Sequence, residues 1–74
     1  MNPEILRYSL KLENEKKYLK ELFEGQRYAR KNFKGHEDTL VLEVYMQQIN
    51  YTRKTIRRLE TIILALNKSN ARIE

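Results

Sequence analysis

Two heptad repeats of apolar residues run through the sequence, and they constrain the fold more than any other feature. In the first half of the chain, positions a and d of the heptad hold Ile5, Tyr8, Leu12, Glu15, Leu19, Leu22, Gln26, Ala29 and Phe33. In the second half they hold Leu42, Tyr45, Ile49, Thr52, Ile56, Leu59, Ile63 and Leu66. A stripe with this spacing is typical of a helix that packs lengthwise against another helix. The sequence therefore predicts an all-α fold of two long helices.

The two repeats also predict how the helices pair. In an antiparallel pair, an a residue of one helix lies in the same layer as a d residue of the other, as Ala29 would with Leu42. All such pairs are symmetric about the bond between Gly35 and His36. Glycine readily adopts the left-handed conformation that ends a helix, so the fold point falls where a turn forms easily. We expect a coiled-coil-like antiparallel hairpin, since two parallel helices from different chains would leave Gly35 unexplained.

Local signals give the expected bounds of the helices. Asn2 is a favoured helix cap, and Pro3 is tolerated at the first helical position because its missing N–H would be unpaired there. We expect one domain over residues 1–74, made of a helix over about 3–32, a turn over about 33–38, a helix over about 39–67 and a frayed tail over 68–74.

Three residues of the first helix depart from a regular apolar pattern. Glu15 and Gln26 place polar groups in the stripe, and we interpret them as residues that specify the register of pairing. Gly25 lies in the helix interior, where glycine costs about 1 kcal/mol relative to alanine. Its presence leaves open a bend in the helix at this point.

The small size of the chain predicts self-association. A chain of 74 residues buries only about 60% of the surface that its unfolded form exposes, and without cysteine it cannot add a disulfide. Apolar residues outside the stripe would support a homodimer that forms a four-helix bundle. These residues are Leu6, Leu10, Phe23, Val41, Val44, Met46, Ile62 and Leu64. They could equally form a groove for the helix of another protein, and both interpretations stay open here.

Basic residues gather in two clusters, within a net charge of +5 and a pI of about 9.6. The two clusters consist of Arg27, Arg30, Lys31 and Lys34, and of Arg53, Lys54, Arg57 and Arg58. Such a surface can contact nucleic-acid phosphates. It can also be an ordinary solvated face, because Glu13 and Glu15 would lie opposite the second cluster. No helix-turn-helix spacing is present, which argues against sequence reading in the major groove by that motif.

The sequence contains no constellation of catalytic or metal-binding residues. With no cysteine and a single histidine, His36 in the predicted turn, we expect no metal site, no cofactor and no small-molecule substrate. No apolar run approaches the length of a membrane span, and no secretion signal is evident, so we expect a cytoplasmic location. A composition rich in Lys, Asn, Ile and Tyr is typical of A+T-rich genomes, such as that of a low-GC bacterium or its phage. For a phage protein, the expected location is the cytoplasm of the host cell.

These features favour a binding protein over an enzyme. The first hypothesis is a small helical adaptor or inhibitor that binds another protein by helix packing and a basic surface. A basic dimeric regulator that binds nucleic acid is the alternative, and a subunit of a structural assembly is the second alternative.

Overall fold

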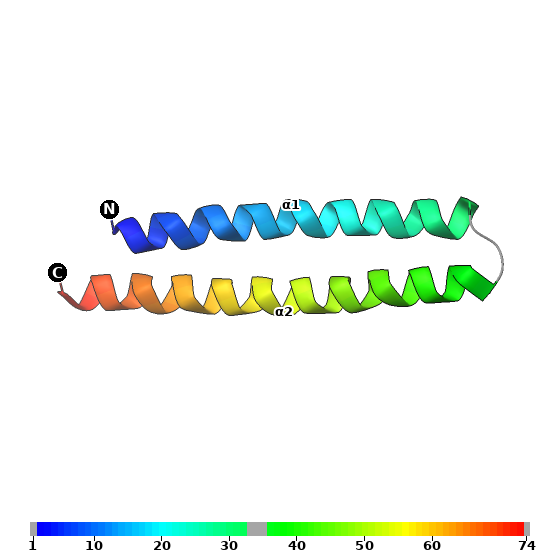
Figure 1. The fold of residues 1–74 in the computed structure, drawn as a ribbon. Coiled ribbons are helices and arrows are strands. Elements are labelled where there is room, and N and C mark those ends of the chain that lie inside the picture. The colour runs from blue at the N-terminus through cyan, green and yellow to red at the C-terminus, as the bar shows by residue number, and fades with distance from the viewer. Residues whose placement is uncertain (1, 33–35, 74) are drawn as a thin grey trace.

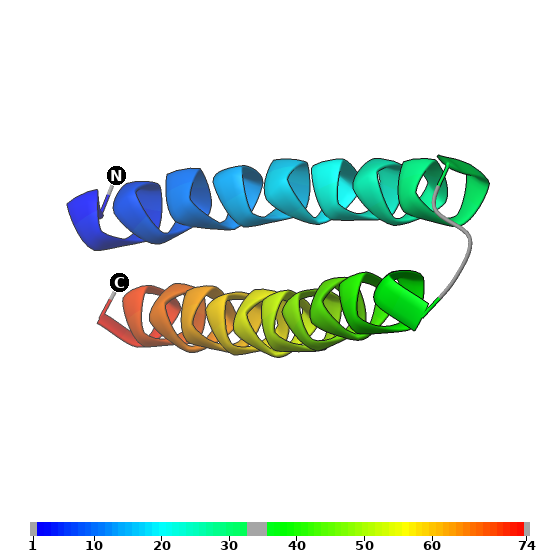
Figure 2. The same cartoon turned by 45° about the vertical axis from the view of Figure 1, so that its right-hand side comes forward.

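The chain forms a long, thin antiparallel hairpin. A computed structural model describes residues 2–32 and 36–73, with the side chains of 2–32 and 39–69. Within this part of the chain there are two helices, α1 (Pro3–Asn32) and α2 (His36–Ile73), and they lie side by side along α1, with the C-terminal end of α2 extending beyond the start of α1 (Figures 1 and 2). The molecule measures 59 × 14 × 12 Å. The predicted all-α hairpin is therefore confirmed.

Asn2 caps the first helix as its position predicts. Its Oδ1 atom accepts a hydrogen bond from the backbone N–H of Glu4, at 2.8 Å, and its carbonyl oxygen accepts one from the N–H of Leu6, at 3.3 Å. The first bond satisfies one of the N–H groups that a helix N-terminus otherwise leaves unpaired, and the second is the first backbone bond of the helix itself. At the other end, Nδ2 of Asn32 donates to the carbonyl of Tyr28 at 2.9 Å, within the last turn.

The second helix is longer than predicted at both ends. It begins at His36 instead of about residue 39, and it continues to Ile73, so the expected frayed tail is largely helical. Asn67, Ser69 and Asn70 are only moderately unfavourable in a helix, and no glycine or proline follows them to stop it. Residues 33–35 of the predicted turn, with Gly35, lie outside the described residues.

The apolar stripes of the two helices face each other. Every a and d residue with a described side chain is buried or half-buried. The best-buried side chains are those of Leu22, Ala29, Ile49, Thr52 and Leu59. Leu22 and Ile49, which the antiparallel register places in one layer, are 7% and 4% exposed. The core is therefore a single narrow seam between two helices.

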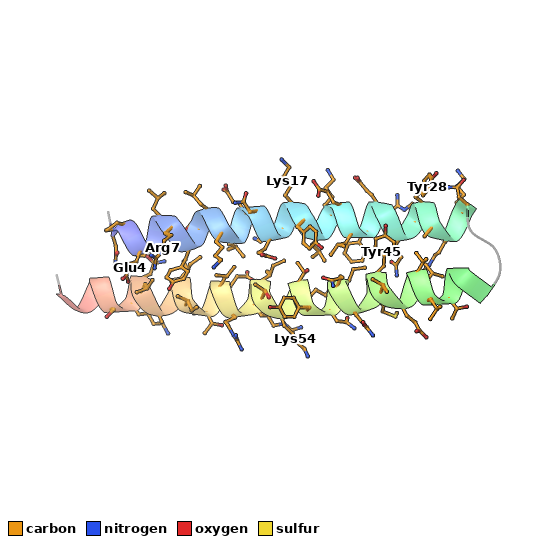
Figure 3. All side chains as sticks on the ribbon, viewed as in Figure 1. Glu4, Arg7, Lys17, Tyr28, Tyr45 and Lys54 are labelled. Carbon is orange, nitrogen blue, oxygen red and sulfur yellow. The ribbon has the colours of Figure 1, made fainter. Side chains whose placement is uncertain are left out.

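Gly25 allows a close approach of the two helices and does not interrupt α1. The ring of Tyr45 lies between the helices (Figure 3). A methyl group placed on Gly25 would lie 2.7 Å from Oη of Tyr45, 2.8 Å from Cε1 and 2.9 Å from Cζ. These distances are too short for any Cβ atom. With the Tyr45 ring in this position only glycine fits at position 25, and any other residue would require the ring to move.

Replacing Gly25 with alanine is expected to lower the free energy of unfolding by about 1–3 kcal/mol, the usual range for overpacking. In a Tyr45→Leu background, the same replacement is expected to raise it by about 1 kcal/mol, because alanine is then only the better helix former. Urea unfolding followed by circular dichroism, at one chain concentration, measures both values. Equal effects in the two backgrounds would show that the ring does not require glycine.

Candidate interaction surfaces

Side chains outside the seam fall on two opposite edges of the hairpin. A helix turns about 100° per residue, so heptad positions b and e lie on one side of the seam and positions c and g on the other. In an antiparallel pair, the e positions of both helices share one edge and the g positions share the other. Position f points outward, as the side chains of Lys17 and Lys54 show (Figure 3).

Each edge has its own character. The basic edge is defined by the b and e residues Lys16, Lys20, Arg27, Arg30, Arg53 and Arg57. The neutral face is defined by the uncharged c and g residues of α2 from Val41 to Ile62, which are Val41, Val44, Gln48, Tyr51, Thr55 and Ile62. Between Leu40 and Ser69, Arg58 is the only charged residue at a c or g position of α2.

Two hollows lie on the basic edge, one on each helix. The first is lined by Phe23, Gln26, Arg27 and Arg30 of α1. The second is lined by Asn50, Arg53, Lys54 and Arg57 of α2. The hollows adjoin, because Cζ of Arg53 lies 5.3 Å from the centre of the Phe23 ring. The edge thus holds two arginine pairs with an aromatic ring between them.

The contact between Phe23 and Arg53 is a cation–π interaction across the two helices. A guanidinium stacked on a ring keeps its N–H donors in its own plane, where they remain available for bidentate contacts with an oxyanion. Phe23 is half-buried, so the ring positions the guanidinium without drawing it into the seam. Arg53 is exposed, and this contact with Phe23 is made across the hairpin from the other helix.

Acidic residues lie near both ends of the basic edge. At b and e positions, Glu60 lies toward the open end of the hairpin, Glu13 lies level with Arg57, and Glu43 of α2 lies level with Arg27 and Arg30. On α1, from Lys16 to Arg30, these positions hold no acid, over about 21 Å at 1.5 Å per residue. The α1 side of the edge is therefore a positive strip without acids of its own.

The neutral face combines exposed apolar groups with few polar ones. Near the turn, Leu40, Val41, Val44 and Tyr45 line an apolar hollow. Further along, Tyr51 is 70% exposed, and the Thr55 hydroxyl donates to the Tyr51 carbonyl at 3.1 Å, which satisfies it within its own helix. This face resembles the stripe of a helix that packs against another helix.

The structure divides both groups of residues that the sequence singled out. Four members of the basic clusters, Arg27, Arg30, Arg53 and Arg57, lie on the basic edge. Lys31 and Lys54 hold outward f positions, Arg58 lies beside the neutral face, and Lys34 is outside the described residues.

The apolar residues are divided in the same way. Leu6, Phe23, Met46 and Leu64 lie on the side of the basic edge, Leu10 lies on the outer side of α1, and Val41, Val44 and Ile62 belong to the neutral face. Leu40, Tyr45 and Tyr51 were missed, although their heptad positions already placed them on or beside this face.

Metal sites, membrane-spanning helices and relatives among known proteins are further guides to function. Among residues 2–32 and 36–73, no group of three or more His, Cys, Asp or Glu side chains could hold a metal ion. In the same part of the chain, neither helix has an apolar stretch that would let it cross a membrane. Comparisons with protein-family models, with curated proteins and with solved structures found no match.

A double-mutant cycle on Phe23→Leu and Arg53→Gln is expected to give a coupling energy of about 0.5–1 kcal/mol in stability, the range of a partly exposed cation–π pair. The matched cycle uses Arg57→Gln in place of Arg53→Gln and is expected to give a coupling near zero. Chemical unfolding of the six chains provides the values. Similar coupling in both cycles would indicate general electrostatics in place of a specific stack.

Proposed function

We propose that the chain is a non-enzymatic protein-interaction module, an adaptor or inhibitor, that acts by helix packing through its neutral face and displays a basic surface. The neutral face carries this proposal. A helix surface with Val41, Val44 and Ile62 and almost no charge is suited to bury against another helix, and a second copy of the chain is the occupant that we propose. Two hairpins then form a four-helix bundle.

The exposed area of the chain supports a second copy as occupant. A compact protein of 9.0 kDa exposes about 4,850 Å², whereas this chain exposes 6454 Å². The excess is about 1,600 Å² per chain, or about 3,200 Å² for two chains, which falls within the range buried by obligate homodimers. A dimer is therefore large enough to give the hairpin the burial that its own seam lacks.

The neutral face is also complementary to itself. If two α2 helices pack antiparallel about a two-fold axis near Tyr51, Val41 of one copy lies in the same layer as Ile62 of the other. Gln48 then lies opposite Thr55, and Arg58 opposite Val44. A two-fold interface requires such reciprocal pairs. The apolar residues thus meet at both ends of the contact, with polar and aromatic groups in the middle.

A lysine at Val44 is expected to weaken the dimer at least tenfold, since it would bury a charge beside Arg58 of the second copy. Met46→Lys is the matched control, because Met46 is 55% exposed against 57% for Val44 and lies on the other edge. Val44→Glu should weaken the dimer less than Val44→Lys, because it faces that arginine. Sedimentation equilibrium measures all three dissociation constants. A wild-type monomer at every concentration, or equal effects of both lysines, would overturn this interface.

Cysteine cross-linking tests the register of the dimer. The chain has no cysteine of its own, so Tyr51→Cys introduces a single thiol close to the proposed two-fold axis. We expect it to form a disulfide-linked dimer under mild oxidation, because that bond requires Cα atoms within about 7 Å. Lys54→Cys, on the outward side of α2, should remain mostly uncross-linked. Equal cross-linking of both variants on non-reducing gels would contradict the register.

The other candidate functions make different predictions. A basic dimer that binds nucleic acid is favoured by the two arginine-lined hollows, which are considered below. A subunit of a structural assembly requires an oligomer much larger than a dimer in the sedimentation experiment. The cytoplasmic location and the absence of catalytic activity remain predictions from the sequence.

A further inference from the structure

We infer that the basic edge is a binding site for single-stranded nucleic acid. In this site, the two hollows hold phosphates of the same strand, and the neighbouring Phe23 and Arg53 side chains contact a base between them. The site goes beyond the proposed function and does not depend on it, because each hairpin carries a complete basic edge on the side away from its neutral face.

The hollows have the chemistry of phosphate sites. Arg27 and Arg30 line the first hollow from adjacent turns of α1, and Arg53 and Arg57 line the second from adjacent turns of α2. Two guanidinium groups around one hollow can offer several N–H donors to a phosphate, and arginine forms bidentate contacts that lysine cannot. Lys54 at the rim of the second hollow adds a further charge.

The stack between the hollows points to unpaired bases. The Cζ atom of Arg53 lies 5.3 Å from the centre of the Phe23 ring, so an aromatic face and a guanidinium, both of which are groups on which splayed bases stack, lie next to each other. The bases of a duplex are stacked inside the helix and could not reach it. An acidic protein segment would use the arginines but not the stack. The combination therefore favours a single strand over both a duplex and an acidic protein.

The length of the strip limits the size of the site. The part of α1 without acids on the basic edge covers about 21 Å, with Glu13 level with Arg57 and Glu43 of α2 level with Arg27 and Arg30. These carboxylates would repel phosphates at the two ends of the site. Each hairpin therefore contacts only a few nucleotides, and binding depends on about four arginine–phosphate contacts.

The experiment measures the affinity of the full chain for fluorescein-labelled twelve-nucleotide oligouridylate and oligothymidylate by anisotropy, as sodium chloride is varied. For about four phosphate contacts on a single strand, the logarithm of the affinity is expected to fall with the logarithm of salt with a slope near −3. Unlabelled duplex DNA of the same length and polyglutamate serve as competitors. Both are expected to compete at least tenfold more weakly than the unlabelled single strand.

Four variants separate a specific site from general positive charge. Arg57→Gln should weaken binding several-fold and reduce the salt slope by about 0.7, whereas Arg58→Gln removes the same charge from the neighbouring residue on the opposite edge and should change neither. Phe23→Leu should weaken binding about fivefold with the slope unchanged, and Phe23→Tyr should restore it. Circular dichroism checks that each variant keeps its helical content.

Several outcomes would overturn the site. These are no binding at 50 mM salt, equal effects of Arg57→Gln and Arg58→Gln, and equal affinity of Phe23→Leu and the wild type. Competition by polyglutamate as strong as that of the single strand would instead identify an acidic protein as the partner, and stronger binding of the duplex would exclude the base stack. Val44→Lys distinguishes this site from the dimer: if the dimer dissociates while the oligonucleotide still binds, the two surfaces act separately.

Discussion

The structure depends on one constraint: two helices packed side by side share a single seam, and among the described side chains only those of the seam are fully buried. The seam takes the a and d positions of both helices and leaves the other five positions of each heptad in contact with solvent. Only five described side chains are well buried, with Leu22 and Ile49 near the middle. In a larger domain most of these surfaces would face other elements. Here they are the outside of the molecule, and their chemistry is free to differ from one edge to the other.

Two aromatic side chains connect the helices beyond the seam, on opposite edges. Tyr45 of α2 reaches across to α1, where Gly25 leaves room for its ring. Phe23 of α1 lies under the guanidinium of Arg53 from α2. Gly25 and Phe23 are two residues apart and therefore face nearly opposite directions around α1. The two contacts hold the pair from both sides at one level, which limits the rotation of each helix about its own axis.

The sequence predicted the architecture well, because heptad phase and chain reversal depend on residue type and spacing alone. The bounds of α1 and the cap at Asn2 follow from such local chemistry. The extent of α2 could not be predicted in this way, since the polar residues around Ser69 weaken a helix without ending it. The reason why glycine occupies position 25 could not be predicted either, because the position of the Tyr45 ring depends on the distance between the helices. The basic and apolar residues were identified as groups, although their heptad positions already assign them to two different edges.

That division decides how the two surfaces can work together. If the neutral faces of two hairpins meet, the basic edges lie on the outer sides of the bundle, directed away from the two-fold axis. Each dimer would then display two identical positive strips, and neither strip would be covered by dimerisation. A long anionic chain that reached both strips would be held with a higher avidity than one strip provides, through effective concentration alone. Between Leu40 and Ser69, Arg58 is the one cation at a c or g position of α2, and in the antiparallel register it lies at the edge of the contact, beside Val44 of the other copy, where its long side chain can extend into solvent.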